Sequence, residues 1–309
     1  MSTMAVLTPS FRDDVDLYRE LHASVLRCTP DDVVHHVVVP HRDADLFAAP
    51  DDPRLRVVTT RTLLPRRFVS TYAGVRAVRR LPGLGRALPG VQAVNLRHPW
   101  PPVRGWVMQQ VLKLELVSRL DVDVVLVVDS DVRLIRPTRA DDFVRDGSVR
   151  FYCGAEAITT DMARHLAWQR VSRRLLGLPP GPPDHRDYIA PFIAWDPAVV
   201  RGLQRRIEAA TGLPWIDAVA RELHVSEFML YGCFVENLGP ETDRAFTSSD
   251  SRCRSWWETW PLDEERARDF VDSIGPSDLA VHVQSASHTS DEVRAWVMES
   301  ADRRARADA

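Results

Sequence analysis

The stretch VDVVLVVDSD, residues 122–131, indicates the fold of this 309-residue chain. Residues 122–128 are almost continuously aliphatic, which is the pattern of a strand buried on both faces of a parallel sheet. Asp129 and Asp131 follow this strand directly. Ligands of open parallel sheets bind beyond the carboxyl ends of the strands. The stretch therefore predicts a central strand that delivers two carboxylates to a ligand-binding edge.

The segments before this strand alternate between strand and helix patterns. Apolar or β-branched runs at Met4–Thr8, Val33–Val39 and Leu55–Thr60 predict strands, and the apolar spacing of Asp13–Cys28 predicts a helix. This alternation predicts an α/β fold with a mostly parallel central sheet flanked by helices. Further helices are expected at Gly105–Leu120, Met162–Leu176, Pro197–Ala210, Pro214–Leu223, Ser226–Val235 and Asp291–Arg306, and further strands at Ile189–Trp195 and Ala280–Gln284.

One long segment, Arg61–Arg104, is rich in proline and glycine and is interpreted as loops, with a basic helix near Tyr72–Arg80. A loop of this length in a compact domain is often functional.

Composition excludes several classes of protein. The net charge of -3 gives no electrostatic reason to expect a nucleic acid partner. No apolar run approaches 18 residues, so we expect no membrane span. The N-terminus lacks the pattern of a signal peptide, and the four cysteines form no CxxC pair, so we expect a cytoplasmic protein with unpaired thiols.

The chain contains a single lysine, Lys113, beside 39 arginines. Arginine and lysine are not equivalent at sites that need a compact ammonium group. Trp106, Gln110 and Lys113 recur at i, i+4 and i+7 and share one helix face. Contact of Gln110 and Lys113 with a diphosphate or ribose would explain this face. Alternatively, the lysine lies at the helix edge, and Gln109 or Gln110 hydrogen-bonds the sheet.

Asp129, Ser130 and Asp131 are the strongest candidates for chemistry. Carboxylates at i and i+2 in an extended segment point to the same side. Such oxygen ligands suit Mg²⁺ or Mn²⁺. A solvated Asp/Ser turn after the strand is the alternative.

Four motifs together carry a family resemblance. The run VVLVVDSDVRLIRP (124–137) resembles the DxD segment of GT-A-type glycosyltransferases. With WVMQQVLKLELV (106–117), VSEFMLYGCFV (225–235) and VHVQS (281–285), it resembles an uncharacterised actinobacterial group of glycosyltransferase-like proteins. The resemblance implies one GT-A-like domain over residues 1–309. Within it we expect a Rossmann-like nucleotide-binding half at about 1–135, an acceptor half at 136–290 and a C-terminal helix at 291–309.

The resemblance also implies roles for individual residues. His282 is expected to complete the metal site formed by Asp129 and Asp131, with His288 as the fallback. Glu227 is expected to be the general base, although Ser-Glu is also an ordinary start of a helix.

The loop after the first strand is expected to contact the base and ribose of the nucleotide. Its candidate residues are Thr8, Ser10 and Arg12. A turn that caps the following helix is the alternative interpretation of this loop. Ser130, between the two aspartates, is a separate candidate for binding the cofactor.

Aromatic residues give two further expectations. Trp195 and Tyr231 either line the sugar or acceptor pocket or belong to the core, which aromatic residues do more often. The cluster Trp256, Trp257 and Trp260 is expected to pack in the protein rather than to form an acceptor or membrane surface.

The expected activity is metal-dependent transfer of a sugar from a nucleoside-diphosphate sugar, most simply a UDP-sugar, by inverting displacement. The acceptor is a small molecule, a glycan or a natural product. The principal alternative is a nucleotide- or sugar-binding protein without turnover. A sugar nucleotidyltransferase is less favoured because the loop TPSFRDD (8–14) has no glycine to cradle phosphates. A phosphatase is least favoured because the usual threonine does not follow the two aspartates.

Overall fold

The computed structural model describes residues 2–71, 91–181, 185–238 and 244–308. The basic helix expected near Tyr72–Arg80 lies outside these ranges.

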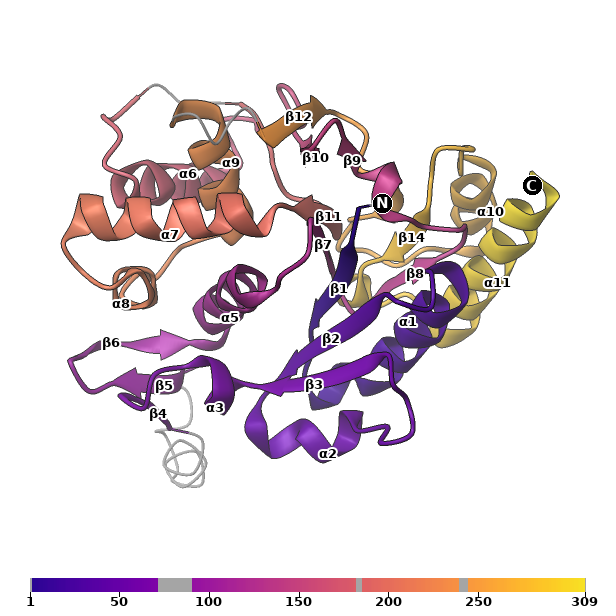
Figure 1. Cartoon of the computed structure of the whole chain (residues 1–309). Coiled ribbons are helices and arrows are strands. Elements are labelled where there is room, and N and C mark those ends of the chain that lie inside the picture. Colours follow the sequence, from indigo (N-terminus) through magenta and orange to yellow (C-terminus); the bar gives the residue numbers. More distant parts are fainter. Residues whose placement is uncertain (1, 72–90, 182–184, 239–243, 309) are drawn as a thin grey trace, which may run out of the picture.

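A five-stranded sheet with the order β11-β7-β1-β2-β3 forms the centre of the molecule (Figure 1). The strands β1 (Met4–Pro9), β2 (Val34–Val39), β3 (Leu55–Thr59) and β7 (Val124–Val128) run parallel, and β11 (Phe192–Trp195) pairs antiparallel with β7. All five residues of β7 are buried. The expected mixed α/β fold with a mostly parallel central sheet is therefore confirmed.

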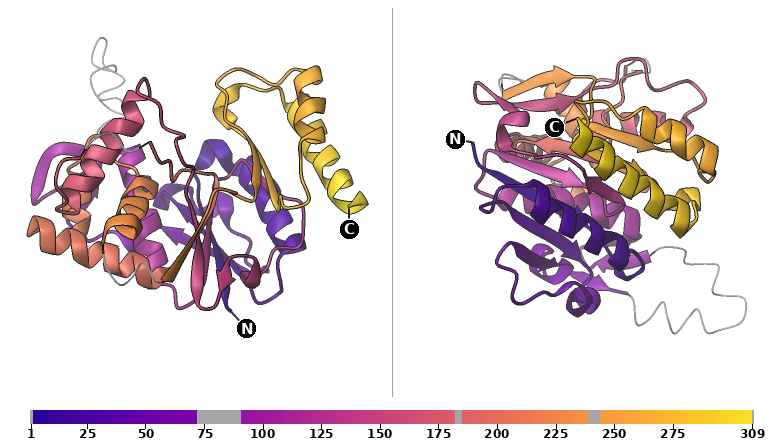
Figure 2. Two further views of the ribbon diagram at one scale, coloured as in Figure 1. Left: turned by 90° about the horizontal axis from the view of Figure 1, so that it is seen from above. Right: turned by 90° about the vertical axis from the view of Figure 1, so that its right-hand side faces the viewer.

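Helices cover both faces of this sheet. Val125 and Val127 of β7 pack in the core with α5 (Gly105–Arg119), whereas Val124 and Leu126 pack in a second core with α1 (Val15–Cys28). This separation follows from the alternation of side chains along a strand. Figure 2 shows the helices between α5 and residue 237 gathered on one side of the molecule. These are α6 (Ala163–Leu175), α7 (Pro197–Thr211), α8 (Trp215–Ala220) and α9 (Glu227–Asn237).

The expectation of loops over Arg61–Arg104 was wrong for much of its described part. This part contains a three-stranded antiparallel sheet, β4 (Phe68–Ser70), β5 (Val91–Asn95) and β6 (His98–Arg104), after the short helix α3 (Thr60–Leu63). No strand was predicted at β6 because this segment contains three prolines. They are tolerated because β6 is an edge strand, so their missing N–H groups are not needed by a second neighbour.

A second small sheet, β13-β14-β8, supports the edge where β7 ends. It contains β8 (Val132–Leu134), β13 (Cys253–Trp256) and β14 (Ala280–Val283), and its register sets His282 opposite Val132. The helices α10 (Glu264–Asp272) and α11 (Asp291–Ala307) pack together beside it, on the side of the molecule away from α6–α9 (Figure 2).

The remaining sheet consists of β9 (Val144–Arg145), β10 (Ser148–Tyr152) and β12 (Ala245–Ser248). The other short elements are α2 (Ala44–Phe47) and the 3₁₀ turns at Arg12–Asp14, His41–Asp43, Ala140–Asp142 and Ser285–Ser287.

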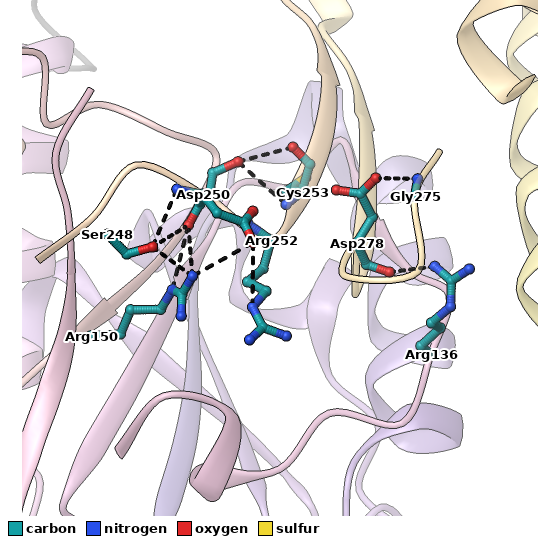
Figure 3. Close-up of polar contacts among 9 residues, drawn as sticks. Arg136, Arg150, Ser248, Asp250, Arg252, Cys253, Gly275 and Asp278 are labelled. Carbon is teal, nitrogen blue, oxygen red and sulfur yellow. Dashed lines mark hydrogen bonds and ion pairs between the residues drawn. The ribbon is translucent and has the colours of Figure 1, made fainter. Parts of the chain in front are cut away.

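Polar contacts fasten the turn between β12 and β13 (Figure 3). Arg150 donates to Ser248 Oγ at 2.6 Å, and the backbone N–H of Asp250 donates to the same oxygen at 3.2 Å. Closer to β14, Arg136 donates to the carbonyl of Asp278 at 2.5 Å. These hydrogen bonds fix the segments that lead into β13 and β14, and His282 lies on β14.

The expectations about the cysteines and about membrane-spanning helices can be compared with the structure. All four cysteines are buried and lie outside any disulfide, as expected. In the described ranges, no helix combines the length and the apolar composition needed to cross a bilayer.

Candidate functional site

Asp129, Ser130 and Asp131 lie at the carboxyl end of β7, the edge at which β1, β2 and β3 also end. The N–H of Asp129 donates to the carbonyl of Pro191 at 2.9 Å, which fixes where the strand turns. The Asp129 side chain is 34% exposed, whereas that of Asp131 is 12% exposed. The first carboxylate therefore faces solvent more than the second.

Lys113 and Glu227 form an ion pair beside Asp129. Lys113 Nζ lies 2.6 Å from Glu227 Oε1 and 3.9 Å from Asp129 Oδ1. Both members of the pair are buried, and the ammonium group lies 4.6 Å from the ring centre of Phe228. The pair exists because α5 and α9 pack together and Ser226 caps α9, which brings Glu227 to the start of that helix.

Asp131 and His282 form the other half of the site. His282 Nε2 lies 3.3 Å from Asp131 Oδ1, and the N–H of Ser285 donates to Asp131 Oδ2 at 2.8 Å. Arg294 of α11 donates to the carbonyls of Asp131 at 3.1 Å and Val283 at 2.6 Å. Because these bonds join β14 and α11 to the end of β7, the C-terminal elements set the position of Asp131.

The surroundings shift the pKa of each group in a different direction. Burial raises the pKa of Asp129 to about 6, with Lys113 acting against it and Asp131 with it. Burial alone would also raise the pKa of Asp131, but the hydrogen bond and charge of His282 lower it to about 2. For Lys113, burial lowers the pKa, and Glu227 and Asp129 more than reverse this, so the net shift is upward.

Asp14 belongs to the same edge and was not among the residues singled out from the sequence. Burial raises its pKa to about 6, and the charge of Asp131 acts in the same direction. Asp14 precedes α1 in the loop after β1. The signal that could have found it is an acidic helix start directly after the first strand of a parallel sheet.

Of the three residues predicted in the loop after β1, Thr8 lies within β1 itself, and all three have different surroundings. Thr8 is fully buried and its hydroxyl lies 2.9 Å from His35 Nε2. Arg12 donates to Asp43 at 3.1 Å. The backbone of Ser10 bonds β2, and its buried hydroxyl has no hydrogen-bond partner among the described residues. Of the three side chains, only that of Ser10 is buried with its polar group unused.

Gln110 is buried and directs its amide N–H to the carbonyl of Trp106 in its own helix, at 3.0 Å. Its amide oxygen is buried without a partner in the described part of the chain. An unsatisfied buried acceptor carries a cost unless something else binds it.

The aromatic residues divide between core and site. Trp195 and Tyr231 stack with ring centres 5.3 Å apart and are buried, so they are core residues and do not line an open pocket. Trp256 donates to the carbonyl of Trp260 at 3.1 Å, but Trp260 is 50% exposed, so the expectation that the whole cluster packs inside the protein was wrong. The third residue, Trp257, is 45% exposed, and its ring centre lies 4.7 Å from that of His282.

The donor atoms suit a divalent metal in type. Asp129 and Asp131 offer carboxylate oxygens, and His282 has a buried Nδ1 without a partner among the described residues. Within the described ranges, however, no three or more His, Cys, Asp or Glu side chains already lie close enough together to hold an ion. The residues fit the group chemically, and an ion would need further ligands from water or a bound substrate.

The fold and this edge define an α/β protein with a carboxylate- and lysine-lined site at the ends of parallel strands. Residues 3–259 match the model of a family of unknown function, DUF6492, and the chain belongs to that family. The matched range ends before His282.

Solved structures of the galactosyltransferase LgtC are also similar to this chain. The complex of LgtC with donor and acceptor sugar analogues is 13% identical, with 98% of this chain and 96% of that chain covered and a TM-score of 0.41. An active-site mutant of LgtC is 13% identical, with 97% and 96% covered and a TM-score of 0.42. No curated protein matches the chain.

Proposed function

We propose that this protein is a metal-dependent glycosyltransferase whose donor is a nucleoside-diphosphate sugar, most simply a UDP-sugar. One observation carries the proposal: four separate elements bring Lys113, Asp129, Asp131, Glu227 and His282 to one edge of the sheet. Ligands bind at this edge in open parallel sheets. An ammonium group beside several carboxylates suits a diphosphate that arrives with a divalent cation.

In this proposal residues 1–135 bind the donor and residues 136–290 hold most of the acceptor. The loop with Ser10 and Arg12 contacts the nucleoside, and Lys113 attracts the diphosphate. Asp129 and Asp131, with His282, would hold Mn²⁺ or Mg²⁺, and such an ion supplies charge neutralisation for the departing diphosphate.

Glu227 is assigned as the general base. Its Oε1 is bonded to Lys113, whereas Oε2 is buried without a partner among the described residues and can accept a proton. The acceptor hydroxyl oxygen forms a bond to the anomeric carbon, the bond from that carbon to the diphosphate oxygen breaks, and the hydroxyl proton passes to Oε2. The anomeric configuration is inverted in such a single displacement.

The test is a thermal-shift experiment with UDP, with Mn²⁺ and with both together. We expect the wild-type protein to be stabilised only when both are present, because each ligand completes the site of the other. Asp131→Ala should abolish this response and also donor hydrolysis. Asp141→Ala removes an equivalent charge from an exposed position and should change neither.

An Asp131→Ala protein that still turns over the donor would refute the proposal. Stabilisation by UDP and Mn²⁺ without hydrolysis of any UDP-sugar would instead favour the non-catalytic binding protein.

A further inference from the structure

A second feature of the same sheet edge is a cavity of about 830 Å³ beyond β2 and β3. It starts at Pro40, directly after β2, and at Thr60, directly after β3. The strands β4 and β5 of the small sheet and Met108 of α5 line its other sides. We call this cavity the arginine pocket.

The charge in the arginine pocket has one sign. The described residues of its lining include Arg42, Arg61, Arg66 and His41, and no aspartate or glutamate. Arg42 lies 3.6 Å from Asp43, which offsets its charge. Arg61 and Arg66 are exposed and form no ion pair with a described carboxylate. Two guanidinium groups are therefore available to an anion.

The rest of the lining is largely apolar. Leu64, Pro65, Phe68 and Met108 provide a surface for a ring or an alkyl group. Guanidinium groups bind phosphates and carboxylates with paired hydrogen bonds. The pocket thus suits an organic anion with both a charged and an apolar part.

The position of the pocket separates it from the carboxylate site. Between β7 and β2 lies only β1, so the pocket begins two strand spacings from Asp129, or roughly 10 Å. Lys113 already provides a cation for a diphosphate, and a nucleoside has no charge of its own. The donor as proposed therefore leaves Arg61 and Arg66 without an assigned ligand.

We propose that the arginine pocket binds the phosphate or carboxylate of the acceptor, which is therefore an anionic compound with an apolar part. The word acceptor rests on the proposed function, whereas anion binding does not. Because the pocket lies within residues 40–108, the acceptor reaches into the half assigned to the donor.

The test uses phenyl phosphate, which has the required charge and ring. Inorganic phosphate presents the charge alone and phenol presents the ring alone. The response to UDP with Mn²⁺ measures binding at the carboxylate site. We expect phenyl phosphate to stabilise the wild-type protein more than either half does. Its affinity should fall at least tenfold in Arg61→Gln/Arg66→Gln, while the response to UDP with Mn²⁺ stays unchanged.

The control is Arg268→Gln/Arg303→Gln, which removes the same charge from exposed positions on α10 and α11. It should retain phenyl phosphate binding. No response of the wild-type protein, or an equal response in both double variants, overturns the proposal. Loss of the UDP response together with the phenyl phosphate response assigns the pocket to the donor and also overturns it. A protein that fails to bind UDP but binds phenyl phosphate through Arg61 and Arg66 contradicts the proposed function and leaves the anion pocket in place.

Discussion

At the scale of single residues, the pair of Lys113 and Glu227 has the largest energetic consequence in the site. Both side chains are buried, with exposures of 7% and 1%. Burying two charges is costly, and their mutual attraction compensates for that cost only while both are present. Lys113, the only lysine in the sequence, therefore contributes to the stability of the fold and is also a candidate ligand of diphosphate.

Removing the ammonium group should destabilise the protein strongly. We expect Lys113→Met to lower the free energy of unfolding by about 3–5 kcal/mol, because Glu227 would be left as an unpaired buried charge. Adding Glu227→Gln should recover most of this loss. Urea denaturation of the two variants measures both effects.

A surface pair provides the comparison. Arg268→Met breaks the exposed contact with Glu264 and should cost less than about 1 kcal/mol. If Lys113→Met is as mild as Arg268→Met, the pair is not a closely coupled buried one.

At the scale of elements, α9 places Glu227 through a close approach at Gly232. A Cβ at Gly232 would lie 2.2 Å from the ring of Tyr188, which itself stacks on Phe151 with ring centres 5.5 Å apart. The helix can take its position only because this residue has no side chain.

Gly232→Ala should therefore lower the melting temperature and weaken the UDP and Mn²⁺ response, because α9 must move and Glu227 moves with it. The cost expected for overpacking is about 1–3 kcal/mol. Reducing the neighbour with Tyr188→Leu should recover part of the loss. Gly275→Ala, where the nearest atom lies at 3.7 Å, should have little effect, and an equal loss there would contradict the steric explanation.

At the scale of the whole molecule, two adjacent histidines of β2 make stability depend on pH. Burial lowers the pKa of His36 to about 4 and lowers that of His35 as well. Each histidine binds fewer protons in the folded protein than in the unfolded chain, where its pKa is about 6.5. Their contribution is present in full above about pH 6.5 and is lost as the pH falls towards 4.

Asp14 and Asp129 act in the opposite direction, since their raised pKa values favour the folded state as the pH falls from about 6. The informative quantity is therefore the difference between a variant and the wild-type protein. We expect His36→Gln to reduce the loss of unfolding free energy between pH 6.5 and pH 4, as measured by urea denaturation at several pH values. His224→Gln alters an exposed histidine and should leave the pH profile unchanged. A profile for His36→Gln that matches wild type would contradict a lowered pKa of His36 in the folded protein.

Local patterns sufficed for much of the fold. The aliphatic run of β7 and the strand–helix alternation before it predicted the parallel sheet. These features can be predicted because the spacing of apolar residues along the chain reflects both the type of element and its burial. The strand β6 was missed because prolines usually exclude strands, and only the partner strand β5 reveals that β6 is an edge.

By itself, the sequence determined the central strand and placed Asp129 and Asp131 at its end, since these features depend on neighbours in the chain. Only the tertiary structure decided that Lys113 pairs with Glu227, 114 residues away, and that Asp131 contacts His282. It also added Asp14 to this edge and opened the arginine pocket between β2, β3 and the small sheet. Such contacts join distant segments, and their distances are set by how helices and sheets pack rather than by the order of residues.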